Sequence, residues 1–392
     1  MICLDRVKNF VVVSAHFPEN YQYFAQRLKG VGMNVLGIGD GVYDELPQEL
    51  KQSLTEYYRV DSMDDYQQMY RAVAYFAFKY GKIDRIESHN EHWLETDARL
   101  RTDFNVRGFK NEDMNQIKRK SSMKAVFNAV GVPAARGRVF KDVEDAKRLV
   151  KELGYPVVIK PDSGVGANDT WKVNNVDDLE MFWKQRQENV SYIMEEFIAG
   201  TIHSYDGLTD QNGHIVFSSS YIYNQGVLDA VSANSSFFYY IRRDIPEELE
   251  EMGRKIVKGF ALKERFFHIE FFLREDGSYM ALEINFRPPG GAGVEMFNYA
   301  NDIDIYQEYA NIVQHNQFTA DVTRPYYCGY ISRKSGRDFK HDNEAVRAHC
   351  GDQLMKLIEV PEAFVPVLGR NGYVVRAKEK AELLDMLAYI DA

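Results

Sequence analysis

Short apolar runs alternate with longer helical patterns over the first hundred residues of this chain. We expect strands at residues 10–14, 33–38 and 83–87, and helices at residues 21–29, 65–80 and 93–101. This β–α–β order predicts a small parallel sheet covered by helices. Ligands of such sheets bind beyond the carboxyl ends of the strands, so the residues that follow the strands are the first candidates for a binding site.

Polar side chains occupy those positions and are candidates for contacting a substrate. They are His16 after the first strand and the group Ser88, His89, Asn90 and Glu91 after a later one. The alternative for each is an ordinary polar loop residue, because loops lie at the surface and favour such side chains.

The pattern changes beyond residue 117. Expected helices cover residues 118–130, 143–153, 303–313 and 380–390, and expected strands cover residues 137–140, 155–161, 171–173, 192–200, 204–210, 215–221, 365–367 and 373–375. The stretch 224–243 is rich in Ser, Tyr and Phe, and we expect it to be a lid or a substrate-binding loop.

A loop of small residues follows the strand that ends in Lys160. It contains Ser163, Gly164 and Gly166, and the strand pattern resumes at residue 171. Glycines in such a loop let backbone amides approach a phosphate closely. The loop lacks the Gly-Lys-Ser/Thr ending of a Walker loop, and a simple turn is the alternative.

Two further strand-like segments, residues 267–273 and 279–287, flank an Asp-Gly pair at residues 276–277. An Asp-Gly pair between such segments is a strong signal for a hairpin turn. The hairpin can place Glu270 and Glu283 side by side on one face, since side chains alternate along a strand. A solvated sheet surface is the alternative, but the strands are otherwise dense in apolar residues.

Two residues downstream of Glu283 on the same face comes Asn285, followed two residues later by Arg287. Two carboxylates and an amide oxygen suit a hard cation such as Mg²⁺ better than zinc. We expect Arg287 to point towards the anion that such a metal would hold. The pattern therefore predicts a site that handles phosphate.

Composition excludes several other classes of protein. The 392 residues carry a net charge of -10, which argues against nucleic acid as the main partner. The three cysteines form no CxxC pair, which fits a reducing compartment. Without a leading apolar segment or a membrane-spanning run, we expect a cytoplasmic protein with no membrane partner; a homodimer is one option for its assembly.

Taken in order, the pieces from residue 118 to residue 392 resemble the ATP-grasp superfamily. The segment before them resembles the preceding domain of carboxylate–amine ligases, biotin carboxylases and carbamoyl-phosphate synthases. The resemblance implies an α/β and α+β protein, in which a small Rossmann-like parallel-sheet domain (1–115) precedes a two-lobed ATP-grasp fold. Its first lobe would span 116–198 and its second lobe, with the metal site and a C-terminal subdomain, 199–392.

The resemblance also implies roles for particular residues. ATP would be bound by Lys124, Lys160, Ser163, Gly164, Gly166, Glu195, Glu196, Phe197, Ile198 and His203. The superfamily often has an acidic residue that binds the ribose at the position of Ile202 in this chain. His203 or Asp206 would replace it here. Glu270, Glu283 and Asn285 would hold Mg²⁺ or Mn²⁺, with two ions expected. Arg287 would steady an acyl phosphate, Lys160 would assist in catalysis, and Gly290 and Gly291 would line the acceptor site.

The leading hypothesis is therefore an ATP-dependent ligase that activates a small carboxylate as an acyl phosphate and joins it to an amine, releasing ADP and phosphate. Phosphoryl transfer of this kind depends on positioning and on charge stabilisation more than on covalent help. One alternative is bicarbonate activation, as in biotin carboxylase or carbamoyl-phosphate synthase. A second is a nucleotide-binding regulator without turnover.

Overall fold

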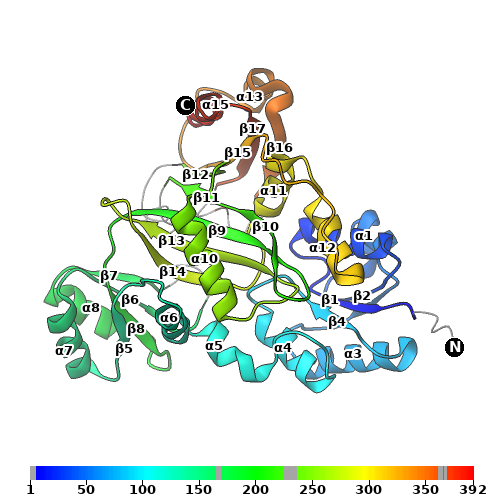
Figure 1. Cartoon of the computed structure of the whole chain (residues 1–392), viewed down its shortest axis with the longest axis horizontal. Helices are drawn as coiled ribbons and strands as arrows, with labels where there is room; N and C mark the ends of the chain where they lie inside the picture. Colours follow the sequence, from blue (N-terminus) through cyan, green and yellow to red (C-terminus); the bar gives the residue numbers. More distant parts are fainter. Residues whose placement is uncertain (1–5, 165–168, 225–235, 361–364, 366–368) are drawn as a thin grey trace.

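The computed structural model describes residues 6–164, 169–224, 236–360, 365 and 369–392, and its strands form three sheets (Figure 1). The N-terminal sheet is parallel, with the strand order β3-β2-β1-β4. Its elements are β1 (Asn9–Val13), β2 (Asn34–Gly39), β3 (Glu56–Arg59) and β4 (Arg85–Glu87), with helices α1 (Gln22–Gly30), α2 (Gln48–Ser53), α3 (Tyr66–Tyr80) and α4 (Leu94–Asp103). The predicted β–α–β arrangement is confirmed.

Strand β3 was not expected from the sequence. It lies at the edge of the sheet, and its Glu-Tyr-Tyr-Arg sequence is only partly buried. An edge strand with one neighbour has no need of the apolar run that identifies a buried parallel strand.

The small lobe contains a four-stranded sheet with the order β5-β8-β6-β7. Its elements are β5 (Gly137–Val139), β6 (Val157–Pro161), β7 (Trp171–Val173) and β8 (Tyr192–Glu196), with helices α7 (Val143–Leu153) and α8 (Val176–Gln185). Gly137 lies so close to β8 that an added Cβ would come within 2.1 Å of the Met194 carbonyl oxygen. A glycine is needed there because no side chain fits.

Two helices lead into this lobe, α5 (Met114–Lys118) and α6 (Lys120–Ala129). The expected single helix over 118–130 is interrupted at Arg119, whose backbone is extended and forms a β-bridge with Ser163. This break makes Lys120 the first residue of α6. The expected domain boundary between residues 115 and 116 falls inside α5. This boundary and the one expected between residues 198 and 199 stay predictions.

The largest sheet has nine strands, in the order β14-β13-β9-β11-β12-β15-β17-β16, with β10 paired to β9. The strands are β9 (Thr201–Thr209), β10 (Ile215–Ser219), β11 (Tyr221–Tyr223), β12 (Phe237–Ile241), β13 (Phe266–Leu273), β14 (Tyr279–Asn285), β15 (Tyr327–Arg333), β16 (Leu354–Glu359) and β17 (Asn371–Ala377). Helix α10 (Glu247–Gly259) lies across β9 and β13 (Figure 1). This packing is close, since a Cβ on Gly253 would meet the Tyr205 ring at 2.1 Å.

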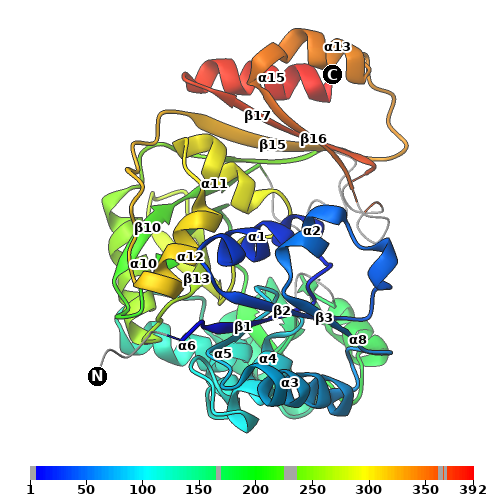
Figure 2. The ribbon, with the colours of Figure 1, turned by 90° about the vertical axis from the view of Figure 1, so that its right-hand side faces the viewer.

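Helices α11 (Gly293–Asn301) and α12 (Ile305–His315) lie between the N-terminal sheet and the last three strands (Figure 2). Helices α13 (Asn343–Cys350) and α15 (Lys380–Asp391) pack on those strands. No helix in the described part of the chain is long and apolar enough to cross a membrane.

The expectation of a lid over residues 224–243 is only partly met. Residues 237–241 form β12, which is hydrogen-bonded between β11 and β15 inside the large sheet. Their dense aromatic sequence is that of a buried strand. Residues 225–235 and most of the strand expected at 365–367 lie outside the described residues.

Candidate functional site

The hairpin of β13 and β14 brings the two predicted carboxylates together. Glu270 lies directly opposite Glu283, and His268 lies directly opposite Asn285. Since side chains alternate along a strand, all four share one face of the sheet. The turn closes with Gly277 at φ 83°, which an Asp-Gly pair accommodates. The two glutamate side chains are 20% and 22% exposed, so the pair is partly removed from water.

This donor set fits a hard divalent cation. Two facing carboxylates would repel each other in a partly buried position unless positive charge lies between or beside them. Among the described residues, no group of three or more His, Cys, Asp or Glu side chains is placed to hold a metal. Asn285 shares this face and would supply a third oxygen donor, and such a set suits Mg²⁺ or Mn²⁺ rather than zinc.

A buried histidine adjoins these carboxylates and was not anticipated from the sequence. His268 Nε2 lies 3.2 Å from Glu270 Oε1, and His268 Nδ1 lies 2.5 Å from Asp206 Oδ1. Burial opposes protonation of His268, but the two carboxylates outweigh it and raise its pKa to about 9. Asp206 thus contacts a histidine on the same face as Glu270 and Glu283, and its other oxygen accepts a hydrogen bond from Ser204.

Two lysines converge on one buried carboxylate at the start of the predicted hinge. Lys160 Nζ lies 2.7 Å from Glu195 Oε2, and Lys124 Nζ lies 2.7 Å from Glu195 Oε1. Burial would raise the pKa of Glu195, but the two ammonium groups hold it below its usual value. Burial also disfavours the charge of Lys160, yet Glu195, Glu283 and Glu270 together raise its pKa. Lys160 and the carboxylates of the predicted metal site therefore face the same space.

A third lysine, Lys120, lies closer to the predicted metal site than Lys124 does. Its Nζ is 3.6 Å from Glu283 Oε2 and donates a hydrogen bond to the Gly164 carbonyl at 3.3 Å. Lys124 instead donates to the Ala135 carbonyl at 2.6 Å. The predicted contact of Lys124 with a nucleotide phosphate stays a prediction. Lys120 is a further candidate that the sequence pattern does not distinguish from it, because the two lysines are four residues apart on one helix face and have the same chemistry.

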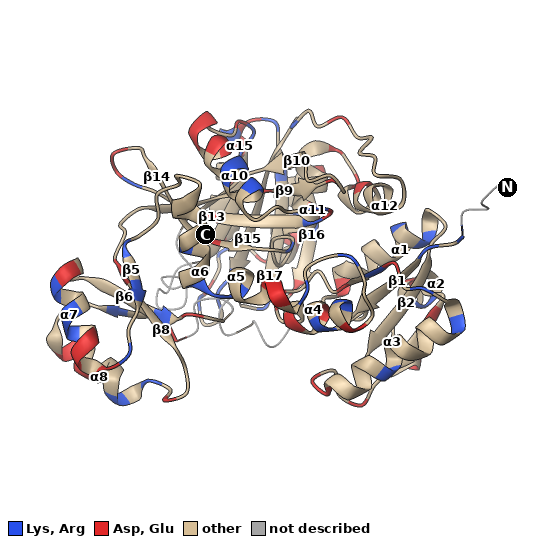
Figure 3. Ribbon diagram, turned by 60° about the horizontal axis from the view of Figure 1, so that its bottom comes forward, with Lys and Arg blue, Asp and Glu red and all other residues tan. Residues whose placement is uncertain are grey.

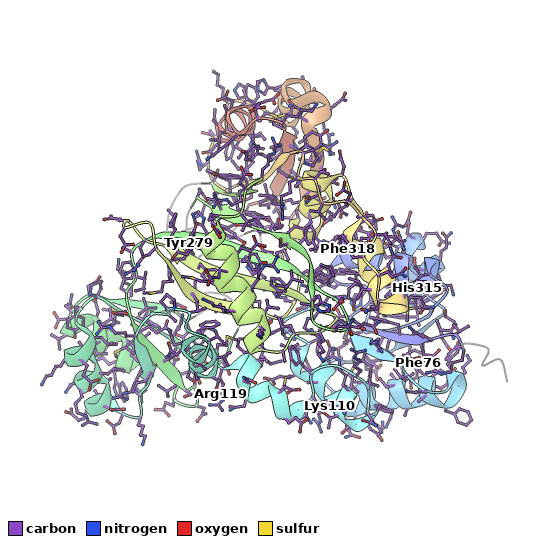
Figure 4. The ribbon with its side chains drawn as sticks, viewed as in Figure 1. Phe76, Lys110, Arg119, Tyr279, His315 and Phe318 are labelled. Carbon is purple, nitrogen blue, oxygen red and sulfur yellow. The ribbon has the colours of Figure 1, made fainter. Side chains whose placement is uncertain are left out.

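The small-residue loop begins at a fixed anchor. Asp162 is buried and accepts hydrogen bonds from the Ser121 backbone amide at 2.8 Å and from its hydroxyl at 3.0 Å. Ser163 donates to the Lys118 carbonyl at 3.3 Å. The start of the loop is thus tied to the start of α6, where Arg119 lies between the small lobe and the rest of the molecule (Figure 4). Gly166 lies outside the described residues.

The remaining hinge residues are Glu196 at the end of β8 and Phe197 and Ile198 after it. Glu196 pairs with Arg136 at 2.7 Å. Phe197 is 36% exposed and lies under the Lys172 ammonium, 3.9 Å from its ring centroid. Ile198 is half-buried. The Phe197 backbone amide donates to the Pro156 carbonyl at 3.2 Å, and the exposed Phe197 ring can receive a flat heterocycle.

His203, which the sequence suggested for the ribose, lies elsewhere. In the strand register it pairs with Phe271, whereas Ser204 pairs with Glu270, so His203 lies on the opposite face of the sheet from the metal-binding group. Its ring packs edge-on against Tyr279, and burial lowers its pKa to about 4. The structure does not bring His203 together with Glu270, Glu283 and Asn285.

Arg287 lies two residues after the end of β14, and its charge affects Glu270 of the hairpin. It donates a hydrogen bond to the Pro288 carbonyl at 2.8 Å. Burial would raise the pKa of Glu270, but His268 and, to a smaller extent, the charge of Arg287 lower it. Its charge also reaches Tyr21 of the N-terminal domain. The exposed Gly291 is held by a hydrogen bond from Asn20 to its carbonyl at 3.2 Å; Gly290 is exposed beside it.

The N-terminal candidates divide into separate environments. His16 lies 3.1 Å from Asp40, and Glu91 lies 3.3 Å from Lys118. Ser88 is buried against Asp97, to which its hydroxyl donates at 2.7 Å. Asn90 accepts from the His92 backbone amide at 2.9 Å.

His89 is a core residue in this structure. Its ring stacks on Phe24 with the centroids 4.1 Å apart and meets Tyr309 edge-on at 4.7 Å. Tyr21, which the charge of Arg287 reaches, meets the same ring edge-on at 6.2 Å. His89 is therefore enclosed by aromatic rings rather than open to a substrate.

Comparison with known proteins agrees with this geometry. Residues 153–295 match the model of the ATP-grasp domain. The chain is 24% identical over 317 residues to an L-arginine-specific L-amino acid ligase of Bacillus subtilis, a match that covers 77% of this chain and 74% of that protein.

Solved structures show the same fold over almost the whole chain. An L-amino acid ligase from Bacillus licheniformis superimposes with a TM-score of 0.75 at 15% identity, covering 98% of this chain and 97% of that one. The biotin carboxylase domain of the Hydrogenobacter thermophilus 2-oxoglutarate carboxylase, solved with MgADP, ADP and bicarbonate, superimposes with a TM-score of 0.73 at 17% identity, covering 98% and 89%. The predicted mixed α/β, two-lobed ATP-grasp architecture is confirmed.

Proposed function

Because residues 153–295 form an ATP-grasp domain in a chain homologous to an amino acid ligase, we propose that this protein is an ADP-forming carboxylate–amine ligase. The observation that carries the proposal is the convergence of Lys120 and Lys160 on the facing pair Glu270 and Glu283. Cations and a metal-binding carboxylate pair around one space are what phosphoryl transfer requires.

In the proposed reaction, a carboxylate oxygen of the first substrate attacks the γ-phosphorus of ATP. An acyl phosphate forms and ADP leaves. The amine nitrogen of the second substrate then attacks the acyl carbon, the carbon–oxygen bond to the phosphoryl group breaks, and phosphate leaves as the amine loses a proton. Lys120 and Lys160 would neutralise phosphate oxygens, and Arg287 would form a two-pronged contact with the acyl phosphate.

Glu270, Glu283 and Asn285 would hold two Mg²⁺ or Mn²⁺ ions, which would offset the phosphate charge during transfer. The exposed Phe197 and the backbone of the hinge would receive the adenine. Gly290 and Gly291, which follow Arg287 in the chain and are exposed, would line the acceptor site, and His16 and Glu91 would contact a substrate. A free amino acid as substrate is suggested by two of the relatives, which are L-amino acid ligases.

The proposal is tested by measuring ADP release with Mg²⁺ and ATP against amino acids, dipeptides, other small carboxylates and bicarbonate, each with and without amines. Turnover that needs both a carboxylate and an amine supports the ligase. Turnover with bicarbonate alone would replace it with the carboxylase-like reaction, and ATP binding without turnover across the panel would favour a regulator.

The metal-binding assignment has its own test in the same hairpin. Glu283→Gln should lower ATP turnover by about 100-fold or more, because it removes a charge that holds the cation. Glu275→Gln is the matched control, since Glu275 is exposed in the turn of this hairpin and undergoes the same chemical change. Full activity of Glu283→Gln would refute the assignment, provided that both variants keep the melting temperature of the wild type.

A further inference from the structure

A basic cavity lies on the N-terminal domain, outside the residues of the candidate ATP site. Its volume is about 350 Å³, and it is lined by Lys82, Ile83, Asp84, Arg85, Asn105, Val106, Arg107 and Lys110. These residues come from the segment that leads into β4 and from the segment that follows α4, and Lys110 lies near the lower edge of the molecule (Figure 4). A cavity of this size is within the range of small-molecule sites.

The charges around this cavity are strongly unbalanced. Four of its lining residues are cationic, and Asp84 is its one carboxylate. That carboxylate is already engaged, by Arg6 at 2.6 Å and by the Asn9 backbone amide at 2.8 Å. Elsewhere acidic and basic residues are interspersed, as on helices α7, α8 and α10 (Figure 3), and the chain as a whole carries a net charge of -10. A local excess of positive charge is therefore unusual for this protein.

Three of the four cations have no carboxylate partner among the described residues. Lys82 is exposed and forms no ion pair there, and Lys110 Nζ donates to the Asn105 side-chain oxygen at 3.0 Å. Arg107 donates to the backbone and side-chain oxygens of Gln211, at 2.6 Å and 3.3 Å. Only Arg85 is neutralised by a carboxylate, that of Glu264. Like charges that line one cavity are stabilised by an anion between them.

An adjoining cavity of about 280 Å³ shares Arg85 and Arg107 with the first. Its other arginines, Arg101 and Arg265, both bind the Glu87 carboxylate, at 2.9 Å and 2.5 Å. Both of these arginines already have a carboxylate partner, whereas three cations of the first cavity have none in the described part of the chain, so an anion is expected in the first cavity rather than in the second.

We propose that the cavity around Lys82, Arg107 and Lys110 binds a small multivalent oxyanion of the phosphate type. A guanidinium presents a planar fork that matches phosphate oxygens, and the two ammonium groups supply point charges beside it. No residue of this cavity belongs to the candidate ATP site. The site therefore binds an anion whether or not the ligase activity proposed above is correct.

The test is calorimetric titration of the full-length protein with inorganic pyrophosphate in a buffer free of Mg²⁺. The double variant Lys82→Gln/Lys110→Gln should bind at least about tenfold more weakly than the wild type, because two charge contacts are lost. The control Lys151→Gln/Lys184→Gln removes two exposed lysines from the last turns of α7 and α8, and should bind as the wild type does.

Equal affinity in the wild type and in Lys82→Gln/Lys110→Gln would overturn the proposal, since pyrophosphate held in the ATP site would give that result. An equal heat from sodium chloride at matched ionic strength would also overturn it. Lys82→Glu is a second variant at an exposed position where folding is not at risk, and it should abolish binding.

Discussion

At the scale of single residues, the candidate site depends on which lysine reaches which oxygen. Lys120 and Lys124 lie one helical turn apart, yet the first reaches Glu283 and the Gly164 carbonyl while the second reaches Glu195. The break at Arg119 explains why the two lysines reach different oxygens. It makes Lys120 the first residue of α6, next to Asp162 at the start of the small-residue loop.

Lys120→Met is expected to lower kcat by about 100-fold or more, because it removes a positive charge from the place where transferred charge develops. Lys124→Met should act mainly on the KM for ATP, since Lys160 still neutralises Glu195. Steady-state kinetics with varied ATP separates the two effects. A loss of kcat in Lys124→Met with a normal kcat in Lys120→Met would reverse the assignment.

Some of this residue-level picture could be read from the sequence and some could not. Glu270 and Glu283 were placed opposite each other correctly, because period-2 alternation and the Asp-Gly turn together determine a hairpin register. The contact of His268 with Asp206 was missed, because it depends on the pairing of β13 with β9 across 62 residues. No local pattern encodes such a pairing.

At the scale of elements, an ion cluster joins the parallel sheet to the metal-binding hairpin. Arg265 directly precedes β13 and forms an ion pair with Glu87 of β4 at 2.5 Å. It also donates a hydrogen bond to the carbonyl of Phe286, the residue before Arg287, at 2.9 Å. Arg101 binds the same carboxylate at 2.9 Å. These two arginines outweigh the effect of burial and lower the pKa of Glu87 to about 2.

Arg265→Met should destabilise the protein by about 3 kcal/mol, since it leaves a buried carboxylate with one partner instead of two. Adding Glu87→Gln to this variant should recover part of the loss, because the unpaired charge is then removed. Denaturant unfolding of the single and double variants gives the coupling between the two residues.

The control for this cycle is Arg254→Met in α10, whose partner Glu250 lies on the same exposed helix face at 2.6 Å. An exposed pair of this kind contributes no more than about 0.5 kcal/mol. Equal losses for Arg265→Met and Arg254→Met would contradict the structural role given to the buried cluster.

At the scale of the whole molecule, His89 lies where three elements of different domains meet. Phe24 of α1, Phe266 of β13 and Tyr309 of α12 surround its ring. Burial is the main reason that the pKa of His89 falls to about 4. In the unfolded chain it would be near 6.5, so the folded state binds fewer protons between pH 6.5 and pH 4.

His89 therefore contributes stability that is present above pH 6.5 and is lost as the pH falls through about 4. The difference corresponds to roughly 3 kcal/mol. Burial raises the pKa of Asp97 to about 7, which acts in the opposite direction, so the wild-type profile alone does not isolate the histidine. Melting temperatures of wild type and His89→Phe should converge or cross as the pH is lowered from 7 to 4.5; parallel profiles would contradict the assignment.

By itself, the sequence determined the β–α–β pattern of the N-terminal domain and the hairpin that pairs Glu270 with Glu283, because these follow from local periodicity and turn chemistry. Tertiary structure decided which lysine faces the carboxylates, that His268 joins them, that His89 is enclosed and that residues 237–241 complete a sheet. Those outcomes depend on contacts between residues far apart in the chain, whose energies exist only once the sheets and helices have packed.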